Sequence, residues 1–154
     1  MTRTRFPLAV VIAASALTII GCRRDDVPPA DSAAAAPAPP APAMVTTIET
    51  GKHIDANKRI VDTASTFAPN DTLYVSVVTN NATSSTMLKT VVTFQTGQVV
   101  DSSSQAVAPP TMAGGSSVTE FHLVKPGGWP TGDYTVELWL DGQSAGTRPL
   151  TVKR

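Results

Sequence analysis

The chain has 154 residues, enough for one ordinary domain with appendages. Its 12 Lys and Arg balance its 12 Asp and Glu, and these charges are scattered, so a basic surface for nucleic acid is not expected. A single cysteine excludes an intramolecular disulfide and a thiolate zinc cage.

The N-terminus has the pattern of an export signal. Arg3 and Arg5 precede "FPLAVVIAASALTII", an uncharged run over residues 6–20. Fifteen helical residues rise about 22 Å, short of the roughly 30 Å hydrocarbon core of a bilayer. A basic start followed by a short apolar run predicts a cleaved signal rather than a membrane span.

The end of this run resembles the lipobox of bacterial lipoproteins, with Ile19, Ile20, Gly21 and Cys22 in the motif's positions. The resemblance implies cleavage before Cys22, a thioether-linked diacylglycerol on its sulfur and an acylated amino terminus, such as a palmitate. Because two or more acyl chains give a stable anchor, we expect a lipid-anchored membrane protein whose signal peptide spans residues 1–21. Arg23 stands where inner-membrane lipoproteins carry Asp, so the outer membrane is favoured if the cell has two. An ordinary signal with an incidental cysteine is the alternative.

Residues 22–43 are predicted to form a lipid-anchored, disordered linker. The stretch "RRDDVPPADSAAAAPAPPAPA" holds six prolines and no aliphatic side chain larger than valine. Proline fixes φ and removes backbone donors, so the segment favours polyproline II and reaches at most about 65 Å. We interpret it as a spacer; a ligand for an aromatic groove is the alternative. Arg23 and Arg24 would add attraction to anionic headgroups.

Residues 44–154 have the pattern of a strand-rich domain. Runs of β-branched and aromatic residues alternate with turn clusters such as "APND", "TNNATSS" and "KPGGWPTGD". The predicted strands cover 73–79, 87–96, 98–102, 117–125, 134–140 and 146–152, with one more strand or pair within 45–63. Ser102 to Ser104 read as a polar loop. The expected fold is all-β, a single antiparallel β-sandwich of about seven strands with little helix.

The strand over 134–140 carries the clearest pattern. Tyr134, Val136, Leu138 and Leu140 alternate with Thr135, Glu137 and Trp139, which predicts one core face and one partly wet face. Asp141-Gly142 then predicts a tight hairpin, since both residues accept φ > 0. "GDYTV" (132–136) resembles the tyrosine corner of immunoglobulin-like domains, with Val136 in the place of the antibody cysteine. The resemblance implies an immunoglobulin-like sandwich and a Tyr134 hydroxyl bonded to nearby backbone.

No catalytic or cofactor-binding constellation is predicted. The serines lie in turn runs without a nucleophile-elbow motif, and no phosphate-binding loop is present. His53 with Asp55, and Glu120 with His122, are i, i+2 pairs that could approach a metal if their strands paired. That spacing arises often by chance, so we expect no metal site, no cofactor and no enzyme.

The two tryptophans and one loop are the candidates for a partner or ligand surface. Trp129 lies with Lys125 in "KPGGWP", and Trp139 falls on the outward phase of its strand. Exposed tryptophans stack on sugars or anchor protein interfaces, whereas a Trp129 folded over the sandwich end and a Trp139 packed under a loop would be structural.

The sequence therefore predicts a non-enzymatic, membrane-anchored envelope lipoprotein. Its domain over 44–154 would bind a protein or a surface polymer, on either the periplasmic or the surface face of the membrane. The alternatives are a proteinase inhibitor using the 125–132 loop and a carbohydrate-binding module using Trp139.

Overall fold

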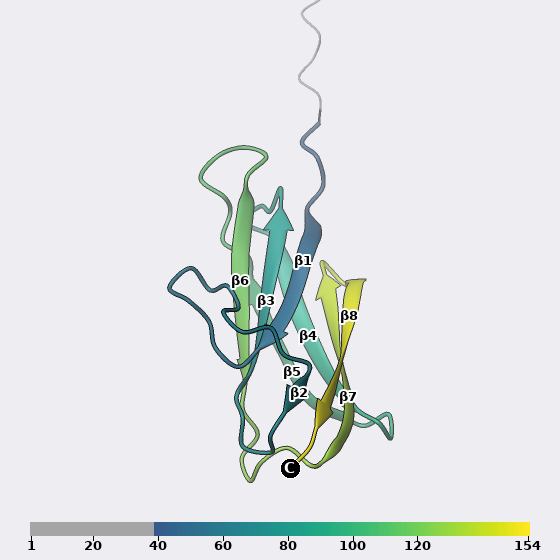
Figure 1. Ribbon diagram of the computed structural model, residues 1–154. Coiled ribbons are helices and arrows are strands. Elements are labelled where there is room, and N and C mark those ends of the chain that lie inside the picture. The colour runs from purple at the N-terminus through teal and green to yellow at the C-terminus, as the bar shows by residue number, and fades with distance from the viewer. Residues whose placement is uncertain (1–38) are drawn as a thin grey trace, which may run out of the picture. The chain divides into compact units, whose positions relative to one another are not determined.

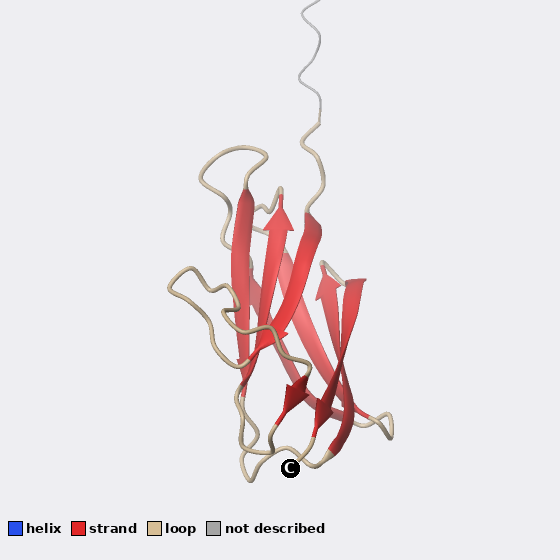
Figure 2. Ribbon diagram, viewed as in Figure 1, coloured by secondary structure: helices blue, strands red, loops and turns tan. Residues whose placement is uncertain are grey.

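The computed structural model describes residues 39–154, so the predicted signal peptide, Cys22 and most of the predicted linker lie outside the described residues. The described part holds eight strands and no helix (Figures 1 and 2). The strands are β1 (Met44–Gly51), β2 (Thr66–Phe67), β3 (Leu73–Asn80), β4 (Met87–Phe94), β5 (Val99–Ala106), β6 (Ser116–Leu123), β7 (Gly132–Leu140) and β8 (Gln143–Val152). Residues 39–154 accordingly contain no apolar helix of membrane-spanning length.

The strands form two sheets that face each other across one core. One sheet has the order β1-β3-β6, and the other has the order β2-β8-β7-β4-β5. Every pairing is antiparallel except the two-residue contact of β2 with β8, which is parallel. The predicted all-β sandwich is confirmed, and β2 is the strand that the sequence did not predict.

The core follows the alternation of the strands. The side chains of β7 that face the core are Tyr134, Val136 and Leu138. They are 3%, 1% and 1% exposed, as the alternating pattern predicted. They meet Val75 and Val77 of β3, which are fully buried in the facing sheet. Burial of one face of each sheet against the other supplies the main stabilisation of such a sandwich.

Tyr134 forms the tyrosine corner. Its hydroxyl donates a 2.7 Å hydrogen bond to the carbonyl oxygen of Pro130. Its ring lies 4.9 Å from the Phe94 ring and 5.7 Å, edge to face, from the Trp129 ring, centroid to centroid. Burial raises the pKa of Tyr134, so the phenol stays protonated and donates. The corner fixes the β6–β7 connection to the start of β7.

The Asp141-Gly142 hairpin between β7 and β8 is confirmed. Asp141 and Gly142 have φ of 48° and 82°, the left-handed pair that a two-residue turn requires. The Asp141 carboxylate also accepts a 2.8 Å hydrogen bond from the backbone N–H of Met87, at the start of β4. The turn is therefore tied to the neighbouring strand.

The predicted loop at Ser102–Ser104 is wrong. Ser102, Ser103 and Ser104 lie inside β5, where they pair with Val91, Thr90 and Lys89 of β4, respectively. Serine's low strand propensity is overridden because β4 supplies the ladder and β5, at the sheet edge, needs little side-chain burial.

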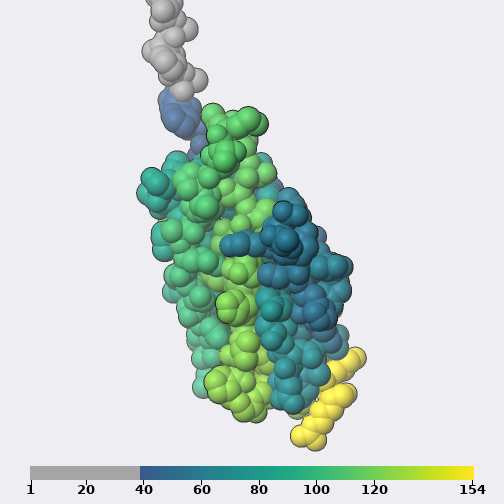
Figure 3. Space-filling model, turned by 90° about the vertical axis from the view of Figure 1, so that its left-hand side faces the viewer, coloured from purple at the N-terminus to yellow at the C-terminus, as the bar shows by residue number. Residues whose placement is uncertain are grey.

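The connection between β1 and β2 covers the outer face of the three-stranded sheet. A short bridge between Ile54 and Ile60 folds the segment 52–65 on itself, and the Asp55 carboxylate accepts the N–H groups of Asn57 and Arg59 at 2.8 and 2.9 Å. The carbonyl oxygen of Lys58 accepts a 2.7 Å hydrogen bond from the Ser76 hydroxyl on β3. Figure 3 shows this segment as a raised blue patch beside the green of β6.

Candidate functional site

The two outer faces of the sandwich differ in how far their side chains are exposed to solvent. On the three-stranded sheet, Ser76 and Val78 are only 2% and 9% exposed, although they point away from the core. On the five-stranded sheet, the outward side chains of β4 and β7 are exposed or half-buried along the whole length of the strands. The outward side chains of β6, in the three-stranded sheet, are also exposed or half-buried, so the five-stranded face is the broader open surface of the two.

A groove crosses this open face at β5, β4 and β7. Strand register places Trp139 of β7 opposite Lys89 of β4, and Lys89 opposite Ser104 of β5. One step along, Glu137 lies opposite Val91. The groove has a volume of about 520 Å³, and Met87 and Gly142 complete its rim. Trp139, the predicted outward tryptophan, is half-buried and is the one aromatic side chain in the lining of this groove.

The groove combines one flat apolar surface with polar groups of both kinds. The Lys89 ammonium can only donate, the Glu137 carboxylate can only accept, and the Ser104 hydroxyl can do both. Ser144 on β8 donates a long hydrogen bond of 3.4 Å to Glu137, which leaves most of the carboxylate's accepting capacity free. Such a set of groups can stack a ligand on the tryptophan ring and form hydrogen bonds to its polar atoms.

Trp129 is not part of an exposed surface, and this corrects its place among the candidates. Its side chain is 4% exposed, its indole N–H donates to the carbonyl oxygen of Asp71 at 3.2 Å, and its backbone N–H donates to that of Pro69 at 2.7 Å. Of the two interpretations left open by the sequence, the folded-in plug is the one the structure has. The apolar ring has no other way to leave water at this open end of the sandwich.

Lys125 and the 125–132 loop lie far from Trp139 along β7. The loop joins β6 to β7 at one end of the sandwich, whereas Trp139 lies next to the hairpin at the other end (Figure 1). A turn closes the loop, with the N–H of Gly128 bonded to the Lys125 carbonyl oxygen at 2.9 Å, and Trp129 anchors its middle. Lys125 and Trp139 therefore do not form one surface.

The histidine pairs do not come together as a metal site. His53 bonds Asp62 through its backbone N–H and its Nδ1, at 2.9 and 3.0 Å, and the bond to His53 holds the pKa of Asp62 below its usual value. His122 lies on β6, whose paired strand is β3, so Tyr74 rather than His53 is its cross-strand neighbour. Residues 39–154 hold no group of three metal-ligating side chains.

A second polar cluster supports the Trp129 plug from the β2–β3 loop. The Asp71 carboxylate accepts hydrogen bonds from Nζ of Lys52 at 2.7 Å and from the N–H of Ala68 at 2.8 Å. The bond from Lys52 is the main reason that the pKa of Asp71 lies below its usual value. The cluster holds in place the carbonyl oxygen that Trp129 binds.

Sequence reasoning found only Trp139 and missed the other residues of the groove, among them Met87, Lys89, Ser104 and Glu137. A signal for three of them existed, because Lys89 and Met87 alternate with buried residues along β4, and Glu137 shares the outward phase of Trp139. What the sequence could not supply was the register that aligns β4 with β7 and β5.

Comparisons with known proteins give the fold. No family model matches the sequence, and no curated protein matches it. An immunoglobulin-like protein from Pseudomonas aeruginosa aligns with a TM-score of 0.50 and 11% identity over 73% of this chain and 98% of that one. The C-terminal domain of Wzt aligns with a TM-score of 0.51 and 11% identity over 73% and 74%. This chain has an immunoglobulin-like fold.

A third match is to part of a larger protein. The alkylpurine DNA glycosylase AlkC of Pseudomonas fluorescens aligns with a TM-score of 0.46 and 10% identity over 73% of this chain. The alignment covers 30% of the glycosylase chain, so this protein spans less than a third of it. The likenesses with TM-scores of 0.50 and 0.51 concern the fold, and none of the three matches carries an activity.

Proposed function

We propose that this chain is an exported, lipid-anchored envelope protein whose immunoglobulin-like domain binds a partner through the Trp139 groove. Its role is to hold a ligand at the membrane rather than to transform it. The lipid would be carried by Cys22, and the Pro/Ala-rich linker would connect it to the domain.

The observation that carries the binding role is the Trp139 groove. A half-buried tryptophan lies on an otherwise uncovered sheet face, beside a donor, an acceptor and a hydroxyl in strand register with it. Aromatic side chains beside adaptable polar groups are typical of binding surfaces. The proteinase-inhibitor alternative gains no such support, since the centre of its loop is buried.

The groove favours a surface polysaccharide over a protein as the ligand. A tryptophan ring offers its flat face to the apolar C–H face of a sugar, and Lys89, Glu137 and Ser104 offer bonds to hydroxyls. The groove is open rather than enclosed, which lets a chain pass along it. A carbohydrate-binding module is therefore the more specific form of this proposal.

Binding through the groove is tested by titration of the purified, lipidated chain in detergent micelles. The probes are soluble oligosaccharides prepared from peptidoglycan and from surface polysaccharide, and the readout is tryptophan emission. We expect one of them to quench this emission saturably in the wild type. Because Trp139→Ala removes the reporter, binding by the variants is measured calorimetrically. We expect at least tenfold weaker binding in Trp139→Ala and unchanged binding in the matched control Thr135→Ala, which lies on the same face of β7 outside the groove. Equal binding by the wild type and Trp139→Ala would exclude the groove. A cross-link from a photoreactive group at residue 89 to an envelope protein would instead identify a protein ligand.

The anchor is tested separately by fractionation of cells that express the full chain. We expect the wild type in the membrane fraction and Cys22→Ala outside it. A Cys22→Ala chain that stays with the membrane would contradict the lipid attachment.

A further inference from the structure

The charged side chains of the described chain are distributed unevenly between the two ends of the sandwich. We call the end at which residues 39–43 lead into β1 the upper end, as it is drawn in Figure 1, and the opposite end the lower end. The upper end is built from four stretches that strand register places at the same level: 39–45, 79–88, 105–117 and 140–143. These stretches hold one charged side chain, Asp141, whereas the other described residues hold sixteen.

The one charged side chain at the upper end already has a hydrogen-bond partner in the protein. The Asp141 carboxylate accepts the backbone N–H of Met87 and serves the β7–β8 turn. The loops beside it, 81–86 and 107–115, consist of Asn, Ser, Thr, Ala, Pro, Gly, Val and Met. The upper end therefore presents a neutral surface, in a protein whose remaining surface carries charges of both signs.

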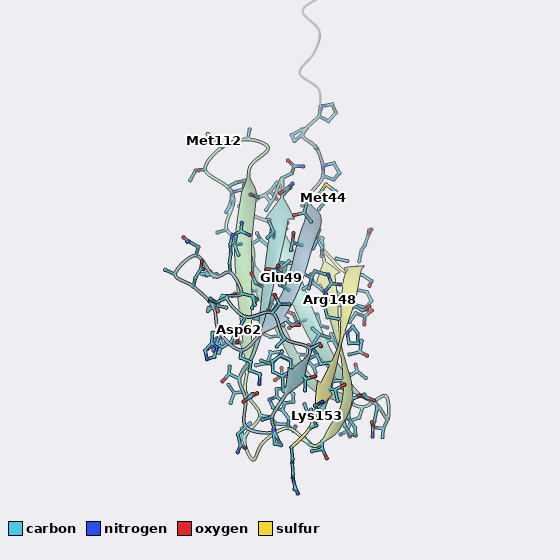
Figure 4. All side chains as sticks on the ribbon, viewed as in Figure 1. Met44, Glu49, Asp62, Met112, Arg148 and Lys153 are labelled. Atoms are coloured by element: carbon cyan, nitrogen blue, oxygen red, sulfur yellow. The ribbon has the colours of Figure 1, made fainter. Side chains whose placement is uncertain are left out.

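Exposed methionines gather at this same end. Met44, Met87 and Met112 are 53%, 44% and 75% exposed, and they are all the methionines of residues 39–154. Figure 4 shows Met44 and Met112 at the top of the molecule, and the labelled Glu49, Asp62, Arg148 and Lys153 below them. Depletion of Lys, Glu and Asp together with enrichment of Met is the composition of a surface that is covered by something.

The course of the chain indicates what covers it. Pro39 lies at the upper end, and sixteen residues separate it from Cys22, the proposed site of the lipid. A linker of that length holds the upper end close to the membrane at an effective concentration in the millimolar range. At that effective concentration even a weak apolar contact with the bilayer is populated. A charged end would incur a large desolvation penalty on contact with the bilayer, whereas a neutral end incurs a small one.

We propose that the upper end of the sandwich rests on the bilayer interface, with Met112 and its loop as the deepest element. This inference depends on the proposed lipid anchor at Cys22. It also gives the domain an orientation. The lower end, with its charges and the C-terminus, faces away from the membrane. The Trp139 groove then opens to the side of the domain, close to the membrane.

The test uses two thiol labels on the full, lipidated chain. The only native cysteine would be blocked by lipid, so a cysteine introduced by Met112→Cys is the single free thiol, and Thr131→Cys gives the matched control in an exposed loop of the lower end. Each variant is labelled with an environment-sensitive fluorophore and reconstituted into phosphatidylcholine vesicles that contain lipids with a nitroxide at the headgroup. We expect quenching at residue 112 to exceed quenching at residue 131 by at least threefold.

Three other results would overturn the inference. Equal quenching at both positions, or none at either, in protein that floats with the vesicles would show that the upper end does not rest on the bilayer while leaving the anchor intact. Disulfide cross-linking between Met112→Cys chains without quenching would show that a second copy covers the surface. Failure of the protein to float would overturn the anchor, and this inference with it.

Discussion

The two ends of the sandwich are stabilised in different ways. The core at the lower end is aromatic: Phe67, Trp129 and Tyr134 are 3%, 4% and 3% exposed, and polar bonds hold the surrounding loops. The core in the upper half of the sandwich is aliphatic, with Leu88, Leu138 and Val107 at 0%, 1% and 2% exposed, and it also holds small and polar side chains, among them Ala82, Thr79, Thr86 and Thr90. The hydroxyls of Thr79 and Thr90 are buried with no hydrogen-bond partner within residues 39–154.

This difference shows that the fold does not depend equally on all of its buried residues. Each buried ring at the lower end removes a large apolar area from water and so contributes strongly to the free energy of folding. The unpartnered hydroxyls lower stability at the upper end. We expect the lower end to anchor the fold and the upper end to be the more tolerant of substitution.

The largest expected effect is at Trp129. Trp129→Ala should lower the free energy of unfolding by about 3–5 kcal/mol, because it leaves a cavity beside Tyr134 and an unpaired carbonyl oxygen at Asp71. Urea denaturation measures the change. Trp129→Phe is the matched control, which fills most of the cavity and should cost less. A loss below about 1 kcal/mol in Trp129→Ala would contradict the anchoring role of the lower end.

In the upper half of the sandwich we expect a gain in stability from a core substitution. Thr90→Val keeps the shape of the side chain and removes the unpartnered hydroxyl, so it should raise the free energy of unfolding by about 1–2 kcal/mol. Thr93→Val, on the outer face of the same strand, should change it little. Destabilisation by Thr90→Val would mean that a bound water satisfies the hydroxyl.

The hydroxyl of the tyrosine corner should contribute about 1 kcal/mol. Tyr134→Phe leaves the ring against Trp129 and Phe94 and deletes only the bond to the Pro130 carbonyl oxygen. Thermal unfolding of the variant should show a lower Tm than the wild type. An unchanged Tm would show that the ring alone fixes the corner.

Trp139 provides the counterpart to Trp129 at the upper end. Trp139→Ala should change the free energy of unfolding by no more than about 1 kcal/mol, because the side chain lies on the outer face and outside the buried core. A loss as large as that of Trp129→Ala would make Trp139 a structural residue, and the proposed groove would then lose its main argument.

The smallest effect is the dependence of stability on pH at the Lys52–Asp71 pair. Because the fold lowers the pKa of Asp71 from its ordinary 3.8, the ionised carboxylate stabilises the folded state above that value, and the contribution disappears as the pH falls through the lowered pKa. The pair is partly exposed, so solvent reduces its strength. A plot of Tm against pH from 6 to 2 should fall slightly less steeply for Asp71→Asn than for the wild type. Parallel curves would contradict this contribution.

Local patterns were sufficient to predict most of the strands and the inner face of β7. The alternation from Tyr134 to Leu140 and the Asp141-Gly142 turn both depend on neighbours in sequence, and both were correct. The serines of β5 and the two-residue β2 were missed because their own sequences do not favour a strand. They become strands by pairing with β4 and β8, respectively. The groove required the same long-range register, so the sequence yielded Trp139 without Lys89 and Ser104. Trp129 was undecided because loop composition does not reveal whether a side chain is buried.

One hydrogen bond has a consequence for when the domain can fold. Nε of Arg148 on β8 donates at 2.9 Å to the carbonyl oxygen of Ile48 on β1, across 100 positions of the sequence. β8 also pairs with β7 along almost its whole length, so the last ten residues of strand complete one sheet and join it to the first strand of the other. Such long-range contacts make folding slow and cannot form before the C-terminus has been synthesised. Until then the two sheets lack this link, so the export that we propose would act on an incompletely folded domain.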